Sequence, residues 1–539
     1  MRGRWVAAGA IVFGMIVAAL RVLGMAGFAN DHFYYLSRAE QVLHGAWPVR
    51  DFIGPGIPLA WLLSLAAQIV GGHSLLSEAV LVAIAFGVSA ALTVWFVASW
   101  TGRAWLGFWA GFVELAVMPR SYSYPKILVY AVAVVAFLRY ARKPSTRTIV
   151  LLAAVTAVAF LFRHDHGVYV GAASCLLVAG LGETPGLSAS FRRVARFVAL
   201  SGLMVVPYLM YVAVVGNLGM YFEDGLRFSE REAARTMLRF PGFDGASLWS
   251  ADGLSVMAYY AFWLAPLIAA GAAWRVKSLP PATRWSVTTV SAMALIMNPG
   301  LLRDPLTSRV PETVVPFTLL MAWMAGRLWS TPSSPTLHRM LRVTTVALLV
   351  AVAAAAGTVG HFEETLERAE LLRRPPRPGL RWREVSAQLR EPFAERQMPS
   401  DAAFALVPFF EYVQACTPST ARILVVGSLP EASYYARRGF AGGQPSLDAV
   451  YYSSPALQRR IVEQLQRELV LFMVAPPDGM QVLSGSYPIV DAYVKGRFVP
   501  MAEFPVDGFD SPARVYVNRG LAPGPTYRET GWPCPGTGR

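Results

Sequence analysis

The sequence NDHFYY at residues 30–35, continued by HGAWPVRDFIGPGIP at residues 44–58, decides the fold of this chain. It directly follows an apolar run over residues 5–28, which is long enough to cross a bilayer. Asp31 therefore lies where a membrane helix ends, and Asp51 follows in the same segment. A charge at the end of a membrane helix is costly unless it is solvated, paired or used. The presence of Asp31 accordingly needs a physical reason.

The composition is that of a polytopic membrane protein. Of the 539 residues, 55% are hydrophobic and only 15% are charged, whereas soluble globular proteins have about 25% charged residues. The net charge of +14 does not indicate nucleic acid, because the Lys and Arg residues fall in short loops between apolar runs. In that position they mark the cytoplasmic side of a membrane.

Eleven apolar runs approach the length of about 20 residues that a spanning helix needs. They cover residues 5–28, 76–99, 105–119, 127–140, 148–163, 166–182, 197–217, 254–274, 285–302, 310–326 and 343–360. A further apolar stretch at residues 57–70 is short for a span. If it lies along the membrane, the N-terminus and the four later basic loops are all cytoplasmic, so the charge pattern favours an interfacial helix there. Residues 221–232 are interpreted as a second amphipathic interfacial helix.

The tail after residue 360 differs in composition from the rest. A linker at residues 373–378 precedes alternating strand and helix signals. The strand candidates are residues 423–427, 469–474, 498–504 and 513–517, and the helix candidates are residues 430–438 and 455–468. This alternation predicts a small α/β domain. We therefore expect a membrane domain over residues 1–360, with its first outer loop at residues 29–56, and an extracytoplasmic α/β domain over residues 361–539.

Cys416 and Cys534 both lie in this tail. If the tail faces an oxidising compartment, a disulfide between them is expected, and two unpaired thiols are the alternative. The cysteine spacing shows no zinc pattern. No metal or other cofactor is indicated, although a divalent ion is left open.

Several basic residues lie at the outer ends of apolar runs, where the topology rule disfavours them. They are Arg120, Lys126, Arg163, Arg303 and Arg309. Cations in this position favour an anion, and a lipid phosphate or pyrophosphate is the obvious one. Snorkelling to ordinary head groups is the alternative for any single arginine.

Two of the acidic candidates have simpler interpretations. Asp31 is a candidate N-cap for the amphipathic stretch that follows it, which does not exclude catalysis. The sequence HDH at residues 164–166 looks like a metal motif, but alternating residues on a helix point to different faces. A pairing of Asp165 with Arg163, or a contact from Asp165 to a sugar hydroxyl, is therefore favoured over metal binding.

An acid directly after the first membrane helix, followed by an aromatic helical loop and HGAWPVRDFIGPGIP, resembles the GT-C superfamily of membrane glycosyltransferases. This superfamily includes protein O-mannosyltransferases, the lipid A aminoarabinose transferase and the bacterial RgtA/B/C/D-like enzymes. The tail, with GSLPE at residues 427–431 and YYARR at residues 434–438, resembles the extracytoplasmic domains of bacterial members. The common acidic pair after the first helix is replaced here by Asp31 and His32, so only one acid corresponds.

The resemblance implies an inverting sugar transfer from a polyprenyl-phosphate donor to a hydroxyl on a lipid, glycan or protein. The reaction would take place on the outer face of the cytoplasmic membrane. Asp31 is then the expected general base. A lipid-phosphate leaving group needs charge stabilisation and no proton donor. The expected donor-phosphate contacts are Lys126, Arg163, Arg303, Arg309 and Arg438, and the expected sugar or acceptor contacts are Tyr34, Asp51, His164 and Asp165.

The competing interpretation is a transporter or lipid-linked-sugar flippase that binds a phosphate head group without chemistry. Transporters place polar residues at mid-membrane on broken helices related by a repeat. Glu114 is the main acid within a span here, and no long repeat is visible. Polar residues concentrate instead at one face, which favours the transferase.

Overall fold

In the computed structural model, the described residues are 2–54, 56–182, 186–235, 240–303, 305–330, 334–391, 400–449 and 453–536. They form two compact units, and neither is continuous in sequence. The helical unit comprises Met1–Ala26, Ala79–Tyr208 and Thr236–Val385. The α/β unit comprises Gly27–Glu78, Leu209–Arg235 and Ser386–Arg539. The division expected at residue 360 thus differs from the one observed, because the first outer loop groups with the tail.

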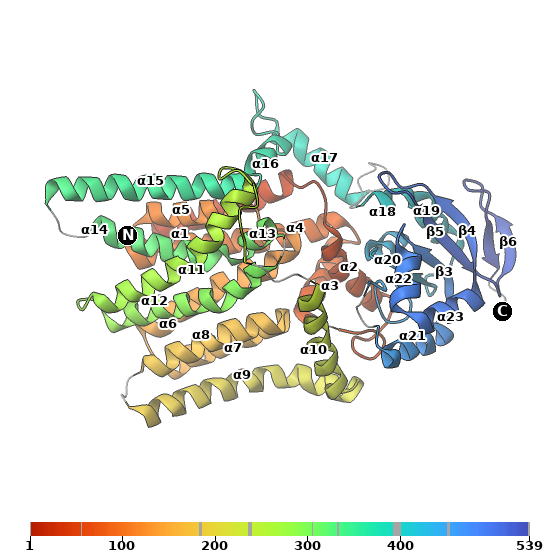
Figure 1. Cartoon of the computed structure of the whole chain (residues 1–539), viewed down its shortest axis with the longest axis horizontal. Helices are drawn as coiled ribbons and strands as arrows, with labels where there is room; N and C mark the ends of the chain where they lie inside the picture. The colour runs from red at the N-terminus through yellow and green to blue at the C-terminus, as the bar shows by residue number, and fades with distance from the viewer. Residues whose placement is uncertain are drawn as a thin grey trace. The chain divides into compact units, whose positions relative to one another are not determined.

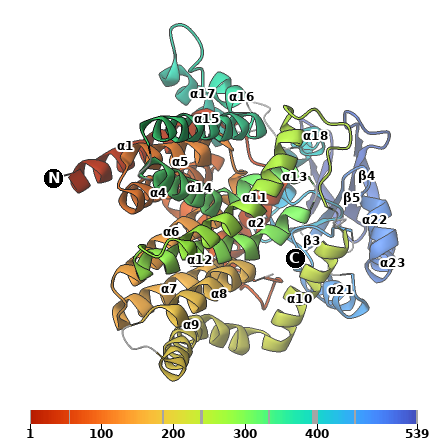
Figure 2. The ribbon, with the colours of Figure 1, turned by 60° about the vertical axis from the view of Figure 1, so that its left-hand side comes forward.

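Each of the eleven predicted apolar runs contains a helix (Figure 1). These helices are α1 (Arg2–Leu23), α4 (Leu75–Thr101), α5 (Ala104–Ala116), α6 (Tyr124–Arg142), α7 (Thr146–Phe162), α8 (His164–Gly180), α9 (Leu187–Val215), α11 (Ala251–Arg275), α12 (Pro281–Met297), α14 (Val314–Ser330) and α15 (Pro335–Val359). Within the described part of the chain, seven helices are long and apolar enough to cross a membrane. Helices α7 and α8 lie side by side in both views (Figures 1 and 2).

Short 3₁₀ and α segments connect the helices at one end of the helical unit. They are η1 (Ser121–Ser123), η2 (Asn298–Leu302), α13 (Leu306–Arg309) and η3 (Val310–Thr313), and α16 (Phe362–Arg368) follows α15. Tight turns in these segments crowd several charged side chains into a short length of chain. Segments η1, η2, α13 and η3 position the charged side chains of the cation cluster described below.

Small residues allow α1 and α4 to pack closely. A Cβ atom on Gly14 would lie 2.5 Å from the carbonyl oxygen of Gly87, and the reverse holds for a Cβ on Gly87. Ala18 and Ala91, one turn further along, complete the contact. This small-residue pattern is a common way for membrane helices to approach. Substitution of either glycine by a larger residue would force the two helices apart.

The helices of the α/β unit include those expected at residues 57–70, 221–232, 430–438 and 455–468. They are α2 (Asn30–Leu43), α3 (Pro58–Gly71), α10 (Leu218–Arg235), α18 (Asp401–Ala405), α19 (Val407–Cys416), α20 (Glu431–Ala436), α21 (Pro455–Arg467), α22 (Gly479–Ser486) and α23 (Pro488–Arg497), while α17 (Pro378–Arg390) crosses the border between the units. Helix α2 packs on α20 and on strand β2. This packing explains why the first outer loop belongs to the same compact unit as the tail.

A five-stranded sheet with the order β2-β1-β3-β5-β4 forms the centre of the tail. The strands are β1 (Arg422–Val425), β2 (Gly439–Phe440), β3 (Val470–Ala475), β4 (Phe498–Phe504) and β5 (Ala513–Asn518). Strand β1 is parallel to β2 and β3, and β5 is antiparallel to β3 and β4. All six residues of β3 are buried, as expected for a central strand covered on both faces. The four strand predictions are confirmed, whereas β2 is too short to leave a sequence signal.

A disulfide joins Cys416, the last residue of α19, to Cys534 in the hairpin of β6 (Ala522–Thr526) and β7 (Pro533–Gly536). The bond expected between these cysteines is therefore present. The Tyr412 hydroxyl donates to the carbonyl oxygen of Pro533 at 2.6 Å, and its ring packs edge-on against Trp532. The proline-rich end of the chain is thus held to α19 by a covalent bond and by aromatic packing.

Candidate active site

Asp31 lies in the first turn of α2 as the second residue of the helix. The N-cap is Ala29, in an extended conformation and without a side-chain cap bond, so the N-cap interpretation of Asp31 is wrong. The Asp31 side chain is exposed, and its carboxylate makes no hydrogen bond or ion pair with the described residues. The Asp31 carboxylate thus lies exposed at the start of α2.

A second acid, which the sequence alone did not single out, contacts the residue that follows Asp31. Nε2 of His32 lies 2.7 Å from Oε1 of Glu78, and both side chains are fully buried. The Ser64 hydroxyl donates to the same carboxylate oxygen at 2.7 Å. These contacts tie the first turn of α2 to α3 and to the start of α4.

Helix α2 is held from its other side by the tail. The Tyr34 hydroxyl donates to the Asp448 carboxylate and lies 2.9 Å from the Ser446 hydroxyl. Burial, together with the nearby Asp448 carboxylate, raises the pKa of Tyr34 well above its usual value. The hydroxyl expected to contact a sugar is therefore engaged inside the protein. Tyr34 acts as an anchor for α2.

Two further contacts fix the register of α2 against the sheet. The Ser37 hydroxyl donates to the carbonyl oxygen of Pro430. The side-chain amide of Gln41 donates to the carbonyl oxygen of Phe440 at 3.2 Å and accepts from its N–H at 2.9 Å. The Gln41 side chain thus pairs with the backbone of the edge strand β2 as a neighbouring strand would. Together with Tyr34, these contacts leave little freedom for the helix that carries Asp31.

The buried Glu40 carboxylate lies between two histidines. Its Oε2 lies 2.7 Å from Nε2 of His73, and its Oε1 lies 3.1 Å from Nε2 of His44. Burial alone would raise the pKa of Glu40, but the hydrogen bonds to the two histidines lower this pKa to about 2. The His73 ring stacks on Tyr434 at 4.7 Å and lines a cavity of about 360 Å³. No sequence motif indicated this group, because its members come from three separate segments.

Asp51 does not converge with Asp31. Its carboxylate accepts two hydrogen bonds from the Arg50 guanidinium and one from the N–H of Trp47, at 2.7–2.8 Å. The neighbouring Phe52 packs on Phe440 beside the C-terminal end of α2. Since a 14-residue helix is about 20 Å long, the two aspartates lie near opposite ends of α2. Asp51 organises its own turn.

The expected cations of the helical unit gather in one cluster, which we call the cation cluster. Nζ of Lys126 lies 2.5 Å from the Glu312 carboxylate, which also accepts from the Ser123 hydroxyl at 2.8 Å. Arg309 approaches Glu312 to 3.9 Å. Arg120 donates to the Tyr122 hydroxyl at 2.8 Å and to Ser308. The start of α6 and the η2–α13–η3 segment therefore meet at this cluster.

Arg163 and Asp165 complete the cation cluster from the α7–α8 turn. Nη2 of Arg163 lies 3.0 Å from the Asp165 carboxylate, and the Arg163 side chain is 42% exposed. Asp165 also interacts electrostatically with Lys126, and Arg303 interacts with Tyr169, as do Arg163 and Asp165. The cluster as described holds five cationic side chains and two carboxylates. An excess of positive charge with an exposed arginine is suited to binding an anion.

The histidines of the HDH sequence point in different directions. The His164 ring stacks on Phe160 at 4.3 Å, while Nδ1 of His166 lies 3.0 Å from the Tyr130 hydroxyl. Over the described ranges, no group of three or more His, Cys, Asp or Glu side chains is placed to hold a metal ion. The predicted pairing of Asp165 with Arg163 is observed, and His164 has an aromatic partner.

The proposed phosphate role of Arg438 is not compatible with its environment. Its side chain is buried, and Nε donates to the Thr417 hydroxyl at 2.8 Å. Its Nη atoms donate to the carbonyl oxygens of Val413, Gln414, Thr417 and Arg437. Arg438 therefore closes the C-terminal end of α19, where carbonyl oxygens lack helical partners. A guanidinium occupied in this way is a structural group and not a ligand contact.

A buried acid at the start of α20 is expected to make the stability of the α/β unit depend on pH. Glu431 is fully buried, accepts from the Ser400 hydroxyl at 2.8 Å, and leaves Oε2 without a described partner. Burial raises the pKa of Glu431 from 4.5 to about 7, and the nearby Asp448 adds to this shift. The folded state therefore binds this proton more tightly than the unfolded state. Its contribution to stability is present below pH 4.5 and is lost as the pH rises to about 7.

Replacement of Glu431 by Gln is expected to stabilise the protein at pH 8 and to reduce the loss of stability between pH 5 and 8. A shift of this size corresponds to about 3 kcal/mol at most. Melting of the full chain in detergent, followed by intrinsic fluorescence at both pH values, measures the effect. Asp507→Asn, an exposed acid of the same unit, serves as the matched control. An unchanged pH dependence in Glu431→Gln would contradict this assignment.

Comparison with known proteins adds no assignment. No protein-family model matches the sequence, and no curated protein matches it closely.

Proposed function

We propose that the protein is an inverting glycosyltransferase of the GT-C type in the cytoplasmic membrane. It would transfer a sugar from a polyprenyl-phosphate donor to a hydroxyl of a lipid, glycan or protein. The eleven apolar helices would span the membrane with the N-terminus inside and the C-terminal domain outside. The observation that carries the proposal is the exposed Asp31 carboxylate, which has no described partner and lies on a helix that is anchored on two sides.

The proposed chemistry needs one base and no acid. The acceptor hydroxyl gives its proton to Asp31 as its oxygen attacks the anomeric carbon of the donor sugar. The bond from that carbon to the phosphate oxygen breaks, and the lipid phosphate leaves with the electron pair. Attack from the side opposite the phosphate inverts the anomeric centre. A positioned base of this kind typically contributes about 10²–10⁴-fold to the rate.

The cation cluster supports a role in holding the lipid phosphate. Its positive excess would stabilise the charge that develops on the leaving phosphate. Arg163 is the most accessible of its described members that form ion pairs. Lys126 and Glu312 neutralise one another at 2.5 Å, so they are better suited to organise the cluster. Arg163 and Arg303 are our proposed direct phosphate contacts.

The hydrogen bonds of Glu114, an acid within the apolar helices, favour a transferase over a transporter. Glu114 of α5 accepts hydrogen bonds from the Ser89 and Thr93 hydroxyls of α4 at 2.6 and 2.7 Å, and its side chain is buried. A carboxylate bound in this way joins two helices. It is less suited to an ion that must bind and leave.

A single assay tests the proposal. The full chain is purified, reconstituted into nanodiscs and incubated with a panel of polyprenyl-phosphate sugars and candidate acceptors, and release of the free lipid phosphate is measured. We expect release with at least one donor. Translocation of a fluorescent lipid-linked sugar in proteoliposomes, without release of lipid phosphate from any donor, would favour the flippase and overturn the proposal.

A further inference from the structure

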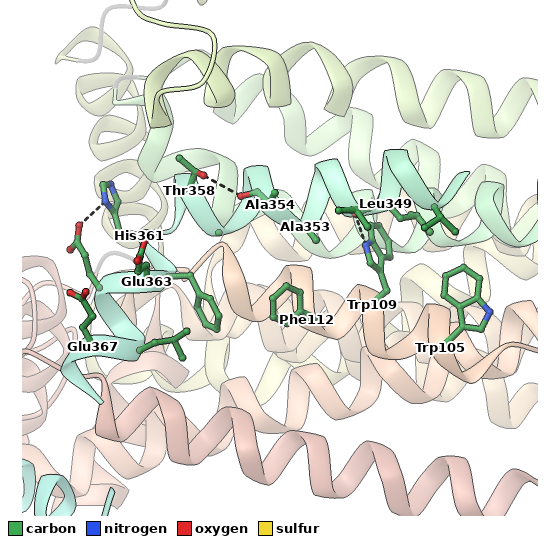
Figure 3. Close-up of a pocket in the computed structure, with 16 residues that line it drawn as sticks. Trp105, Trp109, Phe112, Leu349, Ala353, Ala354, Thr358, His361, Glu363 and Glu367 are labelled. Atoms are coloured by element: carbon green, nitrogen blue, oxygen red, sulfur yellow. Dashed lines mark hydrogen bonds and ion pairs between the residues drawn. The ribbon is translucent and has the colours of Figure 1, made fainter. Parts of the chain in front are cut away.

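The helical unit contains a groove between α5 and α15, with a volume of about 940 Å³ (Figure 3). Three aromatic side chains, Trp105, Trp109 and Phe112, follow one another along its α5 wall. The α15 wall presents mostly aliphatic and small residues. They are Val346, Leu349, Val350, Ala353, Ala354 and Gly357. The interior of the groove is thus apolar along both α5 and α15.

The two walls contact one another at two places along the groove. The indole N–H of Trp109 donates to the carbonyl oxygen of Leu349 at 2.9 Å. Gly360, at the end of α15, packs directly on the backbone of Ala116 and Val117, where a Cβ atom would not fit. Small side chains between these two contacts leave the space open: a Cβ on Gly357 would meet only the Cβ of Phe362, at 3.9 Å. The packing of α5 against α15 therefore creates the groove.

One end of the groove is acidic. His361, Glu363, Glu364 and Glu367 line it where α15 passes into α16. Glu364 is already paired with His361 at 3.0 Å and with Arg368 at 3.8 Å. Glu363 and Glu367 are exposed, and their carboxylates make no hydrogen bond or ion pair with the described residues. Two carboxylates thus remain available at the polar end of an apolar channel.

We propose that this groove is a binding site for a membrane lipid whose head group carries a primary ammonium. One hydrocarbon chain lies along Trp105, Trp109 and Phe112, and the ammonium pairs with Glu363 and Glu367. Charge complementarity selects the occupant, because carboxylates attract an ammonium and repel an unshielded phosphate. The same charge excludes the anionic polyprenyl-phosphate donor from this groove. The site is therefore separate from the proposed transferase site and does not depend on it.

The head-group selection is tested by native mass spectrometry of the full chain in mild detergent. The protein is titrated with phosphatidylethanolamine, phosphatidylglycerol or a polyprenyl phosphate, and the bound fraction is compared. We expect phosphatidylethanolamine to be retained several-fold better than the other two lipids. The double variant Glu363→Gln/Glu367→Gln should remove this preference. The matched control is Glu223→Gln/Glu230→Gln, which neutralises two exposed acids of α10 and should retain it.

A second variant tests the chain-binding part of the groove. Ala354→Phe fills the cavity from the exposed face of α15 and should lower retention of phosphatidylethanolamine several-fold without changing the melting temperature. Equal retention of the three lipids by the wild type would overturn the proposal. So would a loss of preference in the α10 control, or unchanged binding in both groove variants. Lipid-phosphate release by the groove variants is measured in parallel. Failure of the groove proposal can then be told apart from failure of the transferase proposal.

Discussion

Replacement of Asp31 by Asn is expected to abolish sugar transfer without disturbing the fold. Asparagine keeps the shape of the side chain but does not accept the proton of the acceptor hydroxyl. Loss of a general base lowers the rate by about 10²–10⁴-fold, so turnover should fall to the detection limit of a lipid-phosphate release assay. Because the Asp31 carboxylate has no described partner and is exposed, the melting temperature should stay within about 1 °C of that of the wild type, as for other exposed positions.

The chain offers a matched control for this substitution. Asp252 is an exposed aspartate that occupies the second position of α11, as Asp31 does in α2. Asp252→Asn removes the same charge from the same helix position and should leave turnover unchanged. The role of Asp31 as base would be disproved by substantial turnover in Asp31→Asn, or by an equal loss in the Asp252 variant. His32→Gln, which perturbs the buried contact with Glu78, should instead lower stability and activity together.

The double variant Arg163→Ala/Arg303→Ala is expected to reduce kcat/KM by about 10²–10³-fold, the size observed when a charge-stabilising donor is lost. Both side chains belong to the cation cluster. Their removal leaves the leaving phosphate with less positive charge around it. Steady-state kinetics with varied donor concentration measure the effect and separate weaker binding from slower chemistry.

The control for the cluster is Arg192→Ala/Arg196→Ala. These two arginines are exposed at the start of α9 and lie between the apolar runs 166–182 and 197–217, where the charge pattern predicts a cytoplasmic location. They should be replaceable without kinetic effect. Arg163→Lys should keep part of the activity, because a point charge remains while the planar pair of donors is lost. Unchanged kinetics in Arg163→Ala/Arg303→Ala would show that these arginines contact ordinary lipid head groups.

Local sequence patterns were sufficient for most elements of the fold. Apolar length predicted the helices of the eleven runs, each of which contains one, and seven of the described helices are long and apolar enough to cross a membrane. Buried strands such as β3 could be predicted from the sequence, because a strand covered on both faces is continuously apolar. Strand β2 could not be predicted, because a strand of two residues is too short to show a periodic pattern. Strands β6 and β7 contain prolines and glycines, which strand propensity disfavours.

The candidate site was only partly predictable, for a different reason. Position along the membrane helices indicated Asp31 and the cation cluster, since charges at helix ends are rare and costly. The role of an individual side chain depends on its partners. Arg438 appeared to be a free cation in the sequence, but five acceptors surround it in the fold. Tyr34 appeared to be an interfacial aromatic, but its hydroxyl is bound to Asp448.

By itself, the sequence determined which segments are helices or strands, where charged residues flank the apolar runs, and which two cysteines belong to the same domain. These properties depend on the composition and period of neighbouring residues. Only the tertiary structure decided that Glu78 lies behind His32, that Glu40 joins two histidines, and that the first outer loop belongs with the tail. Such pairings join residues that are distant along the chain, and no local pattern encodes a partner that the chain reaches only after it has folded.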